Sequence, residues 1–356
     1  MSGENAVKRA FSEDGALKTH VGGQALIEGV MMRGKYNWAA AVREPQGSVY
    51  VEEHDLASGK ARNGWLYWPV VRGCRAFVES LVLGYKALEI AALHAYSEPS
   101  AEKAPDEGDV AASGDGAGAA APSSAGDEGF EFGKKEMAVS MALGLVLGVA
   151  LFIVAPAFIA NALVGEYDDA TLAWNIVDGI VRVAIFVFYI WLIGRMGDIK
   201  RMFGYHGAEH KTIHCFEHGL PLTPENARSF PRLHVRCGTA FLIMVMIIAI
   251  LVYTITPLNA LISAWGVPDG PAKLALVIVV RILLMPVIAG ISYEITVKWA
   301  GSHPENPLVK VILWPGMQMQ RLTTREPDDG QIECAIAAMQ AVLAREQAEG
   351  KNPTAA

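Results

Sequence analysis

Four long apolar stretches dominate the chain, at residues 137–164, 176–196, 239–262 and 272–297. As an α-helix, each stretch is long enough to cross a hydrocarbon layer of about 30 Å. Soluble domains rarely contain four such stretches, so the pattern predicts a polytopic membrane protein with about four transmembrane helices. The lipid bilayer is therefore the first partner that the sequence predicts.

Outside these stretches, shorter apolar runs predict a small α+β portion. Residues 21–56 contain short apolar runs separated by glycines, with a hairpin turn at Pro45-Gln46-Gly47, which is typical of a small β-rich segment. Residues 65–96 are amphipathic and predict a helix at the membrane interface.

The C-terminal segment, residues 298–348, is expected to mix short strands with a final helix. Apolar runs at 310–313 and 317–322 are read as strands. Asp328 and Asp329 are typical N-terminal caps, and the helix that follows them is expected to end near Glu346. The predicted fold class is mainly α.

Composition identifies two segments that are expected to be disordered. Residues 1–20 form a polar tail, and 97–130 form an acidic linker with almost no large apolar side chain. The net charge of -7 comes partly from this linker, so it gives no sign of a nucleic-acid partner. Hydrophobic residues still make up 52% of the chain, as expected for a membrane protein.

The positions of the basic residues predict the orientation of the bundle. Seven lysines and arginines lie at 195–236, whereas the connections at 165–169 and 264–269 contain none. By the positive-inside rule, the His-rich connection 197–238 and both termini are cytoplasmic, as expected for a multi-pass protein of a bacterial inner membrane. All four cysteines are then on the reducing side, so a structural disulfide is not expected.

Inside the basic connection, His206, Glu209 and His210 form the pattern H-x-x-E-H. On a helix, residues four apart share one face, so the two imidazoles can bind one divalent metal ion, with zinc as the expected ion. Glu209 is then the expected general base of a metal-dependent hydrolase. The alternative is a helix that places histidine and lysine in the lipid headgroup region.

A catalytic zinc site needs a third protein ligand, and Glu294 is our prediction. An acid near the end of an apolar stretch requires a partner, because burying an unpaired charge is costly. The alternative is a salt bridge to Arg195 or Arg236. His234 and Cys237, three residues apart, could supply ligands instead, and His214 and His218 extend the helical series.

Charged residues also occur inside the predicted spans. Arg182 and Arg281 lie near their outer ends, where an arginine can extend to the membrane surface. Arg182 can instead pair with Asp178, four residues earlier. Polar residues are otherwise nearly absent from the spans, which argues against an ion pathway.

Several motifs resemble the YqhQ-like bacterial membrane proteins, a family of unknown function described as predicted metal-dependent enzymes. The matching motifs are GGQALIEGVMMRG at 22–34, YHGAEHKT at 205–212, RCGT at 236–239, SYE at 292–294 and LTTREP at 322–327. The resemblance implies a polytopic membrane protein with a metal site and names no substrate.

Two classes of function follow from these patterns. In the first, His206, His210 and Glu294 bind the metal, and the protein hydrolyses an amide or ester at the cytoplasmic membrane face. In the second, the protein is a membrane scaffold, assembly or transport factor with a structural or regulatory metal site. Either class requires a protein or peptide partner or substrate that the sequence does not name.

Overall fold

The computed structural model describes residues 21–56, 64–96, 127–165, 171–235, 237–256, 258–268, 270–300, 303 and 306–349. The predicted tail at 1–20 and the predicted linker as far as residue 126 lie outside these residues. The described chain is mainly helical and contains one small antiparallel sheet, which confirms this part of the predicted fold class.

The sheet is a meander of four antiparallel strands, β1 (Gly22–Leu26), β2 (Gly29–Arg33), β3 (Asn37–Arg43) and β4 (Val49–Asp55). Gly47, with φ of 96°, completes the β3–β4 hairpin at the predicted turn. Because successive side chains of a strand point to opposite faces, the sheet contributes to two cores. Val30 and Met32 pack with helix α12 (Asp329–Ala348), whereas Met31 and Trp38 pack with helix α2 (Val71–Ala95).

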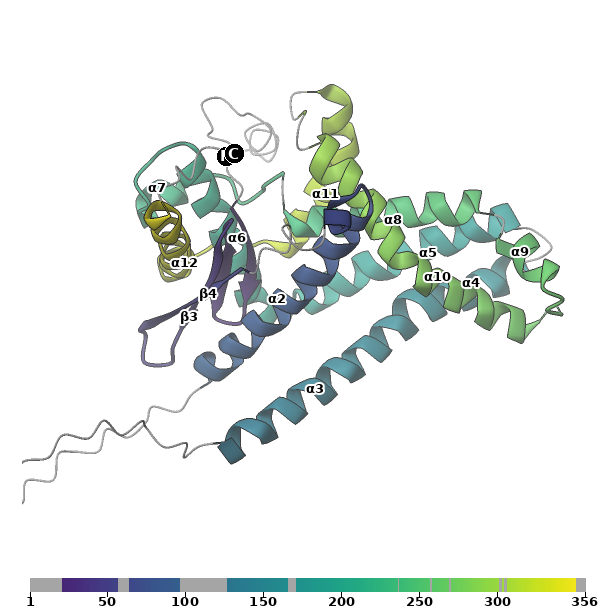
Figure 1. Ribbon diagram of the computed structural model, residues 1–356, viewed down its shortest axis with the longest axis horizontal. Helices are drawn as coiled ribbons and strands as arrows, with labels where there is room; N and C mark the ends of the chain where they lie inside the picture. The colour runs from purple at the N-terminus through teal and green to yellow at the C-terminus, as the bar shows by residue number, and fades with distance from the viewer. Residues whose placement is uncertain are drawn as a thin grey trace, which may run out of the picture.

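The helices follow in chain order: α2 (Val71–Ala95), α3 (Asp127–Val149), α4 (Ala155–Val164), α5 (Thr171–Ile193), α6 (Gly197–Glu217), α7 (Pro224–Arg228), α8 (Gly238–Ile255), α9 (Leu258–Ala264), α10 (Pro271–Tyr293), α11 (Pro307–Thr323) and α12 (Asp329–Ala348). The 3-10 turn η1 (Gly64–Tyr67) precedes α2, and the π-helical segments η2 (Ala150–Val154) and η3 (Glu294–Ala300) follow α3 and α10. Helices α4, α5, α9 and α10 gather at the end of the molecule far from the sheet (Figure 1).

Among the described residues, three helical stretches are long and apolar enough to cross a membrane: Ala138–Val164, Leu172–Ile193 and Pro271–Ala300. They correspond to three of the four predicted spans. The fourth prediction, 239–262, is divided between α8 and α9, and its apolar helix Phe241–Ile255 is shorter than the others. The sequence has Pro257 at the division, and proline disfavours helical geometry in the residue before it. The fourth span therefore stays a prediction.

The candidate spans hold a buried polar cluster that connects α5 to α10. Asp178 Oδ2 accepts hydrogen bonds from Arg182 (2.8 Å) and Arg281 (2.9 Å), and Asn175 Oδ1 accepts another from Arg281 (2.6 Å). The predicted pairing of Arg182 with Asp178 is confirmed. These charged side chains can be buried because each one faces an opposite charge or a polar partner.

Helix α2 confirms the helix that the amphipathic pattern predicts, whereas its place at a membrane interface stays a prediction. One side, including Leu83 and Ala87, packs on the sheet. At its start, Gly73 lies against Gly290 of α10, where a side chain at either position would collide with its neighbour. The two glycines therefore allow α2 and α10 to come into close contact.

The two strands predicted at 310–313 and 317–322 are wrong, because both stretches lie in helix α11. The side chain of Asn306 caps this helix by accepting a hydrogen bond from Leu308 N (2.9 Å). Val309, Leu313 and Met317 recur every four residues and pack in one core. Burial along one side of a helix explains both short apolar runs.

Helix α12 begins where the sequence predicts. Asp328 accepts a hydrogen bond from Gln331 N (2.8 Å), and the side chain of Gln331 accepts one from Asp328 N (3.2 Å). This reciprocal arrangement is a capping box, which satisfies two backbone donors at the start of the helix.

Candidate metal centre

Helix α6 carries the H-x-x-E-H motif and is packed against β1, β2 and α12. Gly204 and Gly207 lower helix propensity, but they lie where α6 meets the side chain of Gln331 and the backbone of Arg325. A side chain at either glycine would separate these elements. The close packing buries the motif inside the protein: His206, Glu209 and His210 are 8%, 4% and 1% exposed.

Backbone carbonyls hold both histidines of the motif in one tautomer. His206 Nδ1 lies 2.8 Å from Thr323 O, and His210 Nδ1 lies 2.7 Å from Arg232 O. Because a carbonyl can only accept, each Nδ1 carries a proton, which leaves Nε2 as the nitrogen that can bind a metal ion in place of a proton. A hydrogen bond of this kind on the outer nitrogen is the usual support of a metal-binding histidine.

Cys237, just before α8, completes a cluster with the two histidines. Its Sγ lies 3.1 Å from His206 Nε2, and the ligand atoms of His206, His210 and Cys237 are all within 4.8 Å of one another. Zinc binds imidazole nitrogen at about 2.0 Å and thiolate sulfur at about 2.3 Å, so ligand atoms a few ångströms apart suit one ion. His210 Nε2 has no hydrogen-bond partner among the described residues, which leaves it available as a ligand.

Electrostatics favours an anionic sulfur at this position. Burial alone would raise the pKa of the Cys237 thiol, but His206 and His210 hold this pKa well below its ordinary value. Burial also opposes a charged His206, yet Cys237 raises the pKa of this imidazole to about 9. A metal cation can take the place of the proton between His206 and Cys237, because metal ions and protons compete for the same lone pairs.

Glu209 lies beside the cluster, against β1. Burial raises the pKa of its carboxyl group to about 6, while His206 and His210 act in the opposite direction. The N–H of Gly23 donates to this carboxylate, and a side chain at Gly23 would collide with it. Glu209 Oε2 has no hydrogen-bond partner within the described ranges, so it can accept a proton.

The structure does not bring Glu294 to this cluster. Its carboxylate forms an ion pair with Arg72 and accepts hydrogen bonds from Arg72 Nε (2.7 Å) and Val70 N (3.2 Å). The residue that lies with His206 and His210 is instead Cys237, which the sequence offered as an alternative. Glu294 therefore has an ion-pair partner, as the alternative prediction required, but this partner is Arg72 of α2. Of the two partners named in that alternative, Arg236 lies outside the described residues.

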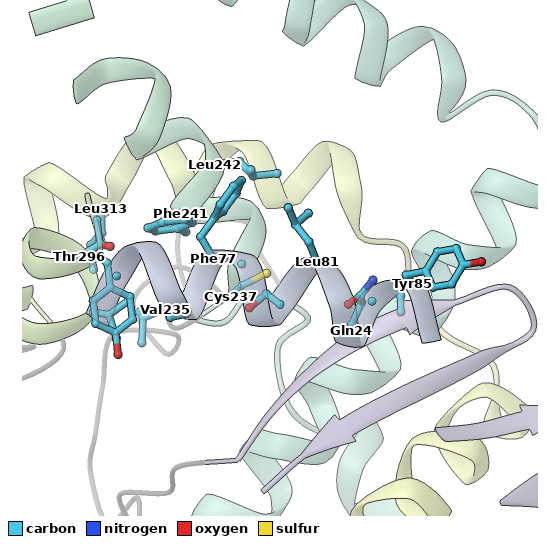
Figure 2. A pocket seen from close by; sticks show the side chains of 18 of the residues that line it. Gln24, Phe77, Leu81, Tyr85, Val235, Cys237, Phe241, Leu242, Thr296 and Leu313 are labelled. Atoms are coloured by element: carbon cyan, nitrogen blue, oxygen red, sulfur yellow. The ribbon is translucent and has the colours of Figure 1, made fainter. Parts of the chain in front are cut away.

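A cavity of about 770 Å³ opens beside Cys237. Its walls come mainly from α2, with further residues from β1, α8, η3 and α11, and are mostly apolar, with Phe77, Leu81, Phe241 and Leu242 among the lining side chains (Figure 2). Of the three clustered residues, Cys237 is the one that lines the cavity. A ligand in this cavity would therefore contact the cluster at its sulfur.

Comparisons with known proteins agree with the resemblance in the motifs. A family model described as "Protein of unknown function (DUF1385)" matches residues 68–345. The chain belongs to this family. It is also 30% identical, over 339 residues, to the "Uncharacterized protein YqhQ" of Bacillus subtilis (strain 168), covering 93% of this chain and 94% of that protein. No solved structure matches the chain.

The DUF1385 match includes the whole cluster and helix α2, and it begins after the sheet. Sequence reasoning identified His206 and His210 but not the carbonyls of Arg232 and Thr323 that orient them. A signal was present, because Thr323 belongs to the LTTREP motif and Cys237 to the RCGT motif. Whether Thr323 and Cys237 lie next to α6 depends on how α11 packs, and the motifs do not predict this packing.

Proposed function

We propose that this DUF1385 protein is a membrane-bound, metal-dependent hydrolase that acts at the cytoplasmic face. His206, His210 and Cys237 would hold the ion, with zinc as the expected metal, and Glu209 would be the general base. The observation that carries this assignment is the convergence of two oriented imidazoles and one thiolate on a common point in a buried site.

The donor set fits a catalytic zinc site. Two nitrogens and one sulfur are ligands that zinc prefers, and three protein ligands leave the fourth position open. A bound zinc ion would supply the charge that makes a water molecule acidic near neutral pH. Glu209 then accepts a proton at Oε2 and donates it to the leaving amine or alcohol. A carboxyl with a pKa of about 6 can perform both steps near neutral pH.

The cavity suggests the kind of substrate. Its apolar wall beside Cys237 favours an amide or ester that is attached to an apolar group, such as an apolar peptide segment or an acyl chain. The basic connection places this reaction on the cytoplasmic side by the positive-inside rule.

Elemental analysis of the purified protein, together with complementation of a deletion strain, tests this function. His206→Ala, His210→Ala and Cys237→Ser should lose bound metal and function, because each removes a ligand. Glu209→Gln should keep the metal and lose function, because it removes only the proton acceptor. Glu294→Ala is the matched control: it removes a half-buried carboxylate that pairs with Arg72, and it should keep the metal.

Normal metal content in all three ligand variants would refute the site. Full function in Glu209→Gln would refute the hydrolase mechanism and favour a membrane scaffold, assembly or transport factor whose metal is structural or regulatory.

A second candidate function uses the same cysteine as a nucleophile. His206 Nε2 lies 3.1 Å from Cys237 Sγ, and Cys237 lines the cavity, which is the arrangement of a cysteine–histidine pair. This mechanism needs no metal. A metal-free preparation that keeps full function, and loses it in Cys237→Ser, would favour the nucleophile over the metal ligand.

A further inference from the structure

A second cluster of metal-ligating side chains lies next to the first, at the C-terminal end of α6. It consists of His214, Glu217 and His234, whose ligand atoms are all within 4.8 Å of one another. The three residues are between 3% and 5% exposed. Two imidazoles and one carboxylate form a common ligand set for first-row divalent metals.

Helical geometry brings His214 and Glu217 together. They lie three residues apart, so they share one face of α6, and His214 follows His210 by one turn. The first and second clusters therefore occupy consecutive turns of one helix. His210 and His234 are neighbours across the boundary, with ring centroids 5.7 Å apart.

His234 is held firmly in front of this face. Its N–H donates to Gln320 Oε1 (2.8 Å), and its carbonyl accepts from Gln320 Nε2 (2.7 Å). Gln320 is fully buried in α11, so the clamp fixes the backbone at His234. His214 Nε2 lies 2.9 Å from Leu233 O, which binds the same segment to α6. A site whose ligands are fixed before binding loses little entropy when an ion enters.

The spacing inside the cluster leaves room for an ion. His234 Nε2 and Glu217 Oε2 are 3.4 Å apart, longer than the roughly 2.7–2.9 Å of a charge-assisted hydrogen bond. The ring centroids of His214 and His234 are 4.7 Å apart. We infer that His214, Glu217 and His234 form a second site for a first-row divalent metal ion, distinct from the His206–His210–Cys237 cluster and without sulfur.

An ion at this site would connect α6 to His234, three residues before Cys237. It would therefore stabilise the position of the sulfur in the first cluster. The second site does not depend on the proposed hydrolase function, because none of its three ligands belongs to the first cluster.

Cobalt(II) distinguishes the two sites, because only the first contains a thiolate, which gives a sulfur-to-cobalt charge-transfer band in the near ultraviolet. Cobalt content and absorption are measured on the full-length protein in detergent. The wild type should bind about two ions, with the band present. Glu217→Gln should lose about one ion and keep the band, whereas Cys237→Ser should lose the band and keep the Glu217-dependent ion. Glu225→Gln, on the exposed part of α7, is the control and should change neither quantity.

Two results would overturn the second site. One is a wild type that binds no cobalt, or a single cobalt ion with the sulfur band present; this result needs no variant and applies even if Glu217→Gln does not fold. The other is Glu217→Gln with the cobalt content of the wild type. A protein that shows no sulfur band but keeps a Glu217-dependent ion would refute the first cluster as a metal site while supporting the second.

Discussion

Replacing Asp178 by asparagine should destabilise the protein more than any single change at the arginines around it. Asp178 Oδ2 accepts from Arg182 at 2.8 Å and from Arg281 at 2.9 Å, and the three side chains are 4%, 8% and 2% exposed. Asparagine keeps the shape of the side chain but removes the negative charge. Two buried guanidinium groups then share a site with no compensating carboxylate.

The size of the effect follows from the number of charges left unpaired. Breaking one buried ion pair by removing a partner costs about 3–5 kcal/mol. Arg182→Gln removes one of the two positive charges and leaves Asp178 paired with Arg281, so we expect a loss of only about 1–2 kcal/mol from the missing hydrogen bond. Thermal unfolding should therefore shift by about 5–10 °C for Asp178→Asn and less for Arg182→Gln.

The assay is thermal unfolding of the protein in detergent, followed by the reaction of the buried Cys215 and Cys334 with a thiol-reactive dye. Because it needs no substrate, this measurement does not depend on the proposed function. If Asp178→Asn unfolds at the wild-type temperature, or if Arg182→Gln is the less stable variant, the cluster does not stabilise the protein through charge pairing.

Two further predictions concern orientation and the reactive sulfur. In intact cells, a membrane-impermeant maleimide should label Asp168→Cys. The variant Arg228→Cys, at an exposed position, should react only after the membrane is permeabilised. The reverse pattern would contradict the orientation that the positive-inside rule predicts. In metal-free protein, alkylation of Cys237 by iodoacetamide should stay rapid from about pH 8 to about pH 6, because a lowered thiol pKa keeps the thiolate present as the pH falls. His206→Ala should make this rate fall with decreasing pH, and equal pH profiles in the two proteins would show that His206 does not lower the pKa.

Local patterns predict those parts of the fold that local interactions determine. The β3–β4 hairpin follows from its turn residues, and α12 from the cap at Asp328. Helix α11 was missed because short apolar runs at 310–313 and 317–322 suit a strand as well as a buried helix. Its start had a readable signal, since Asn306 followed by Pro307 is a typical cap with proline in the first turn.

Contacts between distant segments were harder to predict. The cost of burying Glu294 correctly indicated a partner, but Arg72 lies 222 residues away and approaches only because Gly73 and Gly290 let α2 and α10 pack closely. Similarly, the imidazole of His206 lies between two distant segments, with Thr323 O of α11 at Nδ1 and Cys237 Sγ at Nε2. Neither of these two contacts produces a periodic pattern in the sequence.

The position of Cys237 connects the chemistry of α6 to the membrane part of the protein. α8 begins at the next residue, and Phe241 and Leu242 of this apolar helix line the cavity together with Val297 of η3, the segment that follows α10. Apart from the anionic sulfur of Cys237, no charged side chain is among the described residues that line this cavity. An anionic substrate would lose its hydration there without gaining an ion pair, whereas an apolar group would gain buried contact area. In the proposed hydrolase, the cavity would therefore hold the apolar part of a substrate and bring the neighbouring bond towards the sulfur of Cys237.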